Sequence, residues 1–172
     1  MTPFCFEHVF VADSPATVLA AYFDAGQVRE QDRALDIVDR QILEFVDGEH
    51  EVVRVSRVVP RRQLPTLLRP FQAKQLFYIE RATWPRATTE IAVDIRLLGD
   101  RGLIDARYRV DEVAPGAMRR RYSGHVSVNI ALVAARVERG IALEFEHSLE
   151  RAAACTQTWL DRQSQRSVAA RA

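Results

Sequence analysis

The last part of the chain carries a mainly apolar stripe that repeats with the period of an α-helix. At 3.6 residues per turn it extends over about seven turns, so a large apolar surface elsewhere in the chain must cover it. A sheet is the only partner of that size, which predicts a domain with a long helix packed on a sheet. The stripe consists of Val133, Val137, Ile141, Phe145, Leu149, Ala152, Thr156 and Leu160, flanked by Ala134, Ser148 and Trp159.

One strand and two short helices are predicted before the sheet proper. Aromatic and β-branched residues alternate from Phe4 to Val11, which is the period of a strand. Ser14-Pro15 then offers an N-cap and a proline for the first helical turn, so we expect a short helix that ends near Gly26. A second, charge-rich helix is expected over Val28–Leu35, largely facing solvent.

Six further strands are predicted to form an antiparallel meander. The first two flank Asp47-Gly48, a strong hairpin signal, and the others are separated by turns rich in Pro and Gly. The runs are Ile37–Val46, Glu51–Val59, Gln75–Trp84, Thr88–Leu98, Leu103–Val113 and Ala117–Val128. The proline-punctuated stretch Pro60–Phe71 cannot join the sheet, and we interpret it either as a lid or as a connection packed over a sheet edge.

Composition excludes several classes of partner. The 24 Lys and Arg nearly cancel the 23 Asp and Glu, so no overall field favours nucleic acid or a membrane surface. No stretch approaches the roughly 18 apolar residues of a membrane span, and the first residues lack a signal-like apolar region. We therefore expect a cytoplasmic protein without stable membrane insertion. One domain is expected over residues 1–162, with a disordered tail over 163–172.

Cysteine and histidine spacing offers no metal or redox motif. Cys5 and Cys155 are interpreted as small core residues in a reducing compartment, with a disulfide between them as the alternative. Glu144, His147 and Glu150 share a helix at i, i+3 spacing but lie off the stripe, which favours solvated charges over half of a metal site. His8 alternates with phenylalanines and is interpreted as a hydrogen-bonded core histidine. We expect no metal and no other cofactor.

The order of predicted elements resembles the START-like superfamily, also called helix-grip or SRPBCC. The resemblance spans Phe4–Leu160, and the opening Phe-x-His-x-Phe strand with residues 12–18 looks like the superfamily's characteristic entry into its first helix. Residues 57–65 and 124–133 together with Trp84 resemble an uncharacterised bacterial branch, a domain of unknown function. It implies an α+β helix-grip fold: a curved antiparallel sheet of about seven strands, two short N-terminal helices and one long C-terminal helix packed across the sheet. Better-known members hold an apolar ligand between sheet and helix, so the resemblance also implies a cavity there.

Strand alternation and the helical stripe nominate residues that line this cavity. The candidates are Leu67, Phe71, Tyr78, Ile91, Val93, Ile95, Ala106, Tyr108, Met118, Tyr122, Ile141, Phe145, Ser148 and Trp159. Small side chains at Ala106, Gly124, Ser148 and Ala152 would leave room for a ligand. A core that these residues fill completely is the alternative.

The sequence therefore predicts non-catalytic binding or transport of a hydrophobic or amphipathic small molecule, such as a lipid, a fatty acid or a polyketide-like compound. No catalytic residue is assigned. Two alternatives stay open. One is a metal-free polyketide cyclase or dehydratase, in which inward-facing Arg57, Glu80 or tyrosines orient the substrate. The other is a protein-interaction module with a filled core. Either a monomer or a homodimer is compatible with the sequence.

The arginine run at residues 119–121 is the one local concentration of positive charge on the predicted sheet. Arg107 and Arg109 lie on the neighbouring predicted strand, and Asp105, Asp111 and Glu112 are close in sequence. Alternation divides the three arginines between the two faces of the strand, and we interpret the run as a solvated face rather than as a phosphate or nucleic-acid site.

Overall fold

Seven strands form one antiparallel sheet in the order β1-β7-β6-β5-β4-β3-β2. They are β1 (Thr2–Val11), β2 (Ile37–Asp47), β3 (Glu51–Pro60), β4 (Tyr78–Pro85), β5 (Glu90–Leu97), β6 (Gly102–Ala114) and β7 (Ala117–Val128). The computed structural model describes residues 1–61, 76–97, 99, 101–130 and 133–169. The predicted meander is confirmed, and β1 extends it by pairing with β7. Most of Pro60–Phe71, the predicted lid or connection, lies outside the described residues.

Three helices complete the fold, and each has a local cause. Ser14 caps α1 (Pro15–Phe23) by accepting a hydrogen bond from the backbone N–H of Thr17. Asp24 ends α1 and caps α2 (Ala25–Ala34) through the N–H of Gln27, so the first helix ends before Gly26. The long helix α3 (Ala134–Ala169) follows the apolar stripe and remains helical to Ala169, where a tail was expected.

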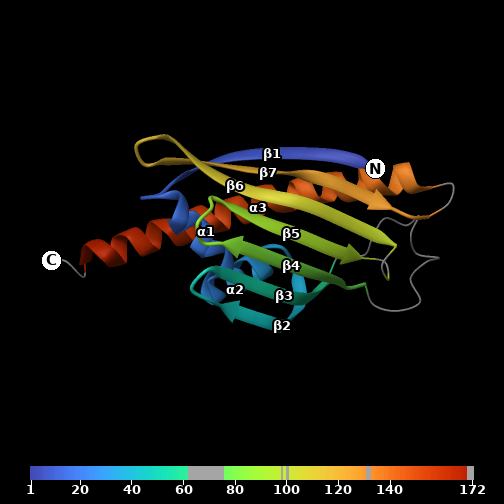
Figure 1. Ribbon diagram of the computed structural model, residues 1–172, viewed down its shortest axis with the longest axis horizontal. Coiled ribbons are helices and arrows are strands. Elements are labelled where there is room, and N and C mark those ends of the chain that lie inside the picture. Colours follow the sequence, from blue (N-terminus) through green and yellow to red (C-terminus); the bar gives the residue numbers. More distant parts are fainter. Residues whose placement is uncertain (62–75, 98, 100, 131–132, 170–172) are drawn as a thin grey trace.

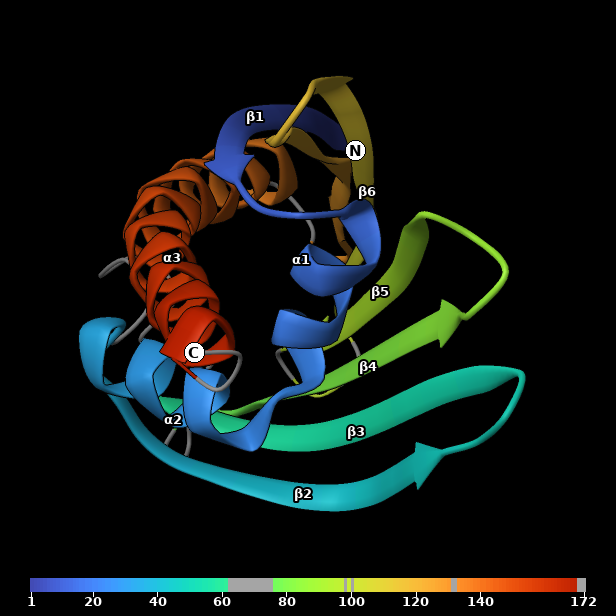
Figure 2. The same cartoon turned by 90° about the vertical axis from the view of Figure 1, so that its left-hand side faces the viewer.

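The helices lie in the concave side of the curved sheet, as the end-on view in Figure 2 shows. Helix α3 packs on β1 and β7 at one edge, and α1 and α2 lie between α3 and the rest of the sheet (Figure 1). The prediction that α2 faces mainly solvent is wrong, because Gln27 and Val28 are buried where α2 packs on α3. Across the middle strands, α3 is held away from the sheet, which leaves space for a pocket.

The predicted faces of the central strands are confirmed. Ile91, Val93, Ala106 and Val126 are among the fully buried residues of one continuous core. The sequence left the facing of β4 open, and the structure directs Tyr78, Glu80, Ala82 and Trp84 inward. On β1 the even-numbered residues face the core, so the prediction that Cys5 is a core residue is wrong: it is exposed, Cys155 is half-buried, and both thiols are free.

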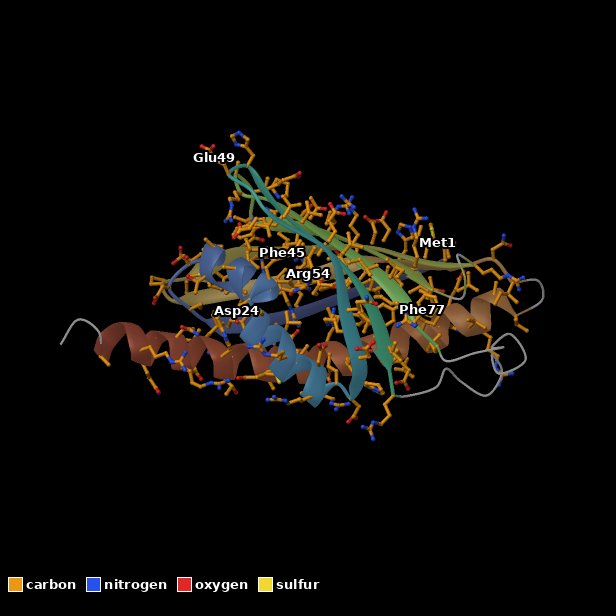
Figure 3. All side chains as sticks on the ribbon, turned by 90° about the horizontal axis from the view of Figure 1, so that it is seen from below. Met1, Asp24, Phe45, Glu49, Arg54 and Phe77 are labelled. Atoms are coloured by element: carbon orange, nitrogen blue, oxygen red, sulfur yellow. The ribbon has the colours of Figure 1, made fainter. Side chains whose placement is uncertain are left out.

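The β2–β3 hairpin projects beyond the helices, with Glu49 near its tip (Figure 3). Strand β2 is the edge of the sheet and exposes Val38, Ile42, Leu43 and Phe45. Among the described residues, no helix is both long enough and apolar enough to cross a membrane.

A buried carboxylate connects the start of α3 to the sheet. Glu138 accepts hydrogen bonds from the backbone N–H of Val128 at 2.9 Å and from the hydroxyl of Thr2 at 3.0 Å. Its other close partner is the Met1 ammonium, 2.7 Å away. Burial alone raises the pKa of the Glu138 carboxyl, but the hydrogen bonds from these three groups outweigh burial and hold the pKa below its usual value.

Substitution of Glu138 by glutamine should therefore destabilise the protein in a pH-dependent way. A carboxyl whose pKa is lower in the folded state stabilises the fold fully above its unfolded value of about 4.3. That contribution is lost as the pH falls through the folded value. We expect Glu138→Gln to lower the free energy of unfolding by about 1–3 kcal/mol near neutral pH, and by less near pH 3. Urea unfolding of wild type and variant at both pH values tests this. The same difference in the free energy of unfolding at pH 3 and at neutral pH would contradict it.

Candidate ligand pocket

A pocket of about 840 Å³ lies between the middle of α3 and strands β3 to β7. Helices α1 and α2 and the first residues of β2 supply the rest of its wall. Its lining includes Tyr22, Gln31, Ile37, Arg40, Arg54, Tyr78, Glu80, Ile95, Leu97, Ile104, Tyr108, Arg120, Tyr122, Ile141, Phe145, Ser148 and Thr156. The lining also includes two exposed residues of α3, His147 and Arg151, and the half-buried Leu35. The volume of the pocket falls within the usual range of small-molecule sites.

The structure places half of the predicted lining residues on the wall of this pocket. These are Tyr78, Ile95, Tyr108, Tyr122, Ile141, Phe145 and Ser148. The other described candidates do not line it: Ile91, Val93, Ala106 and Met118 fill the core beneath, and Trp159 packs against that core nearer the end of α3. Leu67 and Phe71 lie outside the described residues. Contact of any of them with a ligand stays a prediction.

Aromatic rings form the apolar part of the wall. The Tyr108 ring meets Tyr22 at 5.2 Å and Tyr122 at 5.6 Å between centroids, in edge-to-face geometry. Phe145 of α3 lies edge-on to Tyr122 at 5.4 Å and to Phe4 at the same distance. Such contacts hold large side chains in fixed positions, so one rigid wall joins α1, the sheet and α3.

A network of ion pairs lies at the β2–β4 side of the pocket. The Glu80 carboxylate is 3.1 Å from Arg54 and 3.7 Å from Arg40, and Arg40 also binds Asp32 through two nitrogens. Arg54 donates a further hydrogen bond to the backbone carbonyl of Tyr22 at 2.7 Å and lies over the Tyr22 ring. Despite being buried, Arg40 has a pKa above its ordinary value, because Glu80 and Asp32 face it. The two arginines and two acids balance in charge. Figure 3 labels Arg54 at this position.

The tyrosines of the pocket are neutral hydrogen-bonding groups. Burial raises the pKa of the Tyr22, Tyr78, Tyr108 and Tyr122 hydroxyls, and the Glu80 charge adds to the effect for Tyr22, Tyr78 and Tyr122. At physiological pH each phenol therefore keeps its proton. A neutral phenol can donate a hydrogen bond to a ligand oxygen, but it is not an ionised base.

Arg120 is the functional candidate that contradicts its sequence-based interpretation. The arginine run was interpreted as a solvated face, and Arg107, Arg109 and Arg121 are indeed exposed and paired with acidic residues. Arg120 instead is 3% exposed and lines the pocket. The reason is strand alternation: Met118, Arg120 and Tyr122 share the inner face of β7.

Alternation also places Arg54 and Glu80 on the inner face, in line with Val52 and Ala82 of the same strands. The sequence interpretation named Glu80 and the tyrosines as possible inward groups but also Arg57, which lies on the outer face of β3 against Phe77. Arg54 and Arg40 were missed. Arg54 could have been found from the alternation of Val52, Arg54, Ser56 and Val58. Arg40 could not, because a bulge in β2 between Ile37 and Asp39 interrupts the alternation.

Histidines do not assemble a site here. Within the described ranges, no group of three or more His, Cys, Asp or Glu side chains could hold a metal ion. His147 is exposed at the pocket rim, and His8 is half-buried rather than fully enclosed, with its ring 4.8 Å from that of Phe10. Burial, together with the charge of Arg120, lowers the pKa of His8.

Sequence comparison assigns the chain to a family. Residues 8–160 match the family described as "Protein of unknown function (DUF2505)". The chain belongs to this family. No curated protein matches the sequence. The matched range contains every described residue that lines the pocket, from Tyr22 to Thr156, and leaves out residues 1–7 and 161–172.

Solved structures share the fold of this DUF2505 protein at low sequence identity. The ZhuI aromatase/cyclase from Streptomyces sp. R1128 has a TM-score of 0.62 and 13% identity over 94% of this chain and 96% of that one. A START superfamily protein from Mycobacterium smegmatis has a TM-score of 0.61 and 12% identity, with coverages of 95% and 99%.

Norcoclaurine synthase from Thalictrum flavum, solved with dopamine and hydroxybenzaldehyde, has a TM-score of 0.61 and 16% identity, with coverages of 92% and 86%. These likenesses confirm that the DUF2505 chain has the START-like, helix-grip fold.

Proposed function

We propose that this protein binds a hydrophobic or amphipathic small molecule, of the lipid, fatty acid or polyketide-like kind, in the pocket between its sheet and α3, without transforming it chemically. The observation that carries the proposal is the pocket itself: about 840 Å³, with aliphatic and aromatic side chains on much of its wall. Burial of apolar ligand surface there contributes about 25 cal/mol per Å². A core filled by its own side chains does not leave a space of this size.

The buried polar groups of the pocket favour binding over acid–base chemistry. Glu80, the buried carboxylate on the wall, is engaged by two arginines. The tyrosines hold their protons, because burial raises the pKa of each hydroxyl. A general base needs a free proton acceptor within reach of the substrate. These residues supply orientation through hydrogen bonds instead.

A cyclase is the alternative function, because an aromatase/cyclase and norcoclaurine synthase share the fold. A cyclase would use the same tyrosines and the Arg54–Glu80 pair to orient an enolising chain. Analysis of the compound that is extracted from the purified protein distinguishes a carrier from a cyclase. A single unreacted apolar compound at one equivalent per chain, seen by native mass spectrometry, supports the carrier. Conversion of an added poly-β-ketone into a cyclised product would contradict it.

Substitution of Phe145 by tryptophan should obstruct the pocket. Phe145 enters from α3 and contacts Tyr122 and Phe4, so a larger ring there must extend into the space that a ligand would occupy. We expect about tenfold weaker binding of a neutral apolar dye such as Nile red, a loss of about 1.4 kcal/mol. Fluorescence titration measures it.

Leu143→Trp is the matched control, because Leu143 is on the same helix but 53% exposed. It should leave the dye affinity unchanged. Equal affinities of wild type and Phe145→Trp would place the ligand elsewhere.

A further inference from the structure

Among the arginines that line the pocket, Arg120 is the one for which no described residue supplies a counter-charge. Four described arginines line the wall, and three of them are paired: Arg40 with Asp32, Arg54 with Glu80, and Arg151 with Asp36. Arg120 forms no ion pair with any described residue. Its Nε has no hydrogen-bond partner, which is also true of one nitrogen each in Arg40 and Arg54, so the missing counter-charge is what sets Arg120 apart. The longest stretch outside the described residues, 62–75, contains no Asp or Glu.

The surroundings of Arg120 compensate its charge only in part. Its guanidinium carbon lies 5.4 Å from the centre of the Phe10 ring and 5.7 Å from that of Tyr108, and it interacts with the Tyr108 hydroxyl. Aromatic faces stabilise a cation weakly compared with a carboxylate. An arginine does not escape burial by losing its proton, because its guanidinium stays protonated in proteins. A guanidinium that is 3% exposed and unpaired is therefore costly in the empty protein.

The pocket offers a way to remove this cost. Arg120 lies on its wall beside Tyr108 and Tyr122, whose hydroxyls keep their protons. A cation flanked by neutral donors is the arrangement that binds a single anionic group through charge-assisted hydrogen bonds. The rest of the wall, with Ile95, Ile104 and Phe145, suits an apolar chain or ring.

We propose that the ligand of this pocket is an amphipathic carboxylic acid, bound as its anion, with the carboxylate on Arg120 and the apolar part against α3 and the central strands. The inference rests on the proposed function and narrows it from any apolar molecule to an acidic one. It also assigns different roles to the arginines of the wall: Arg40 and Arg54 belong to an ion network whose charges balance without ligand, and Arg120 binds the ligand.

The test compares an acid with its neutral analogue in proteins that differ at one residue. Laurate and dodecanol, and likewise pyrenebutyrate and pyrenebutanol, are titrated as competitors of Nile red against the wild type, Arg120→Met and Arg121→Met. Arg121 is the matched control, because it is the next residue on β7 but is exposed and paired with Glu7. Nile red is neutral, so its own binding reports the apolar pocket alone.

We expect the wild type and Arg121→Met to prefer each acid over its alcohol by about tenfold or more. Arg120→Met should lose this preference, which is taken as the ratio of acid to alcohol affinity within each protein, so that a changed Nile red affinity cancels. Because that substitution removes an unpaired buried charge, the variant should keep or raise its unfolding midpoint in the absence of ligand.

Equal affinities of acid and alcohol for the wild type would overturn the inference whatever the variants do, and so would an acid preference that survives in Arg120→Met. Both results leave the proposed function intact as long as Nile red binds. Failure of all five compounds to bind the wild type would instead remove the proposed function itself.

Discussion

Glutamine in place of Glu80 should lower the free energy of unfolding by about 3–5 kcal/mol. Glu80 is 9% exposed and lies within 3.1 Å of Arg54 and 3.7 Å of Arg40. A neutral amide leaves the Arg54 guanidinium buried without a counter-charge, since its remaining hydrogen bond goes to the Tyr22 carbonyl. Breaking one side of a buried pair costs more than the intact pair contributes. Urea unfolding of wild type and variant measures the difference.

Two further variants show whether the loss comes from burial. Glu44→Gln removes the acid of an exposed pair with Arg81, where the side chains are 48% and 51% exposed, and should cost less than about 1 kcal/mol. Arg54→Met combined with Glu80→Gln should cost less than the sum of the two single changes, because no unpaired charge remains at that position. Similar losses for Glu80→Gln and Glu44→Gln would show that the network contributes no more than a surface pair.

The fold could be predicted because its signals are local and repeated. Alternation along the strands, Asp47-Gly48 in the hairpin and the long stripe of α3 each specify one element, and the covering of that stripe specifies how the layers meet. The errors occurred where one side chain decides a boundary. Asp24 starts α2 earlier than the residue pattern indicates, and the helical signal after Leu160 is weak although the helix continues to Ala169.

The pocket lining was harder to predict than the fold, because the depth of a side chain below the pocket wall does not repeat along the sequence. Alternation correctly places Ile91, Val93 and Met118 on the inner face, but it does not distinguish a residue under the pocket from one on its wall. The charge of the arginine run led to the opposite error, in which a residue on the pocket wall was interpreted as exposed. An arginine run suggests solvent, yet strand geometry turns its middle residue inward irrespective of charge. Buried charges in a predicted strand are therefore found by position first and by residue type second.

Gly124 shows how a small residue can be misinterpreted as space for a ligand. The sequence interpretation counted it among the residues that leave room in the cavity. A Cβ added to Gly124 would lie 2.1 Å from the carbonyl oxygen of Asp105 and 2.7 Å from the Cα of Ala106. Gly124 and Ala106 are paired across β7 and β6. The backbone of β6, rather than a ligand, occupies the space beside Gly124, which allows the two strands to approach closely at this point.

Alanine at position 124 should therefore destabilise the protein by about 3 kcal/mol or more, at or beyond the upper end for overpacking, because backbone atoms have to move. Ser123→Ala, the neighbouring position on β7, adds no atoms and should change stability by less than about 0.5 kcal/mol. Thermal and urea unfolding of both variants provide the comparison. A Gly124→Ala protein as stable as the wild type would show that β6 and β7 separate easily, and the pocket wall that holds Tyr108 and Tyr122 would then not be rigid. A large loss for Gly124→Ala alone would show that the two strands pair closely and resist separation, which supports fixed positions for the two tyrosines and for Arg120 beside them.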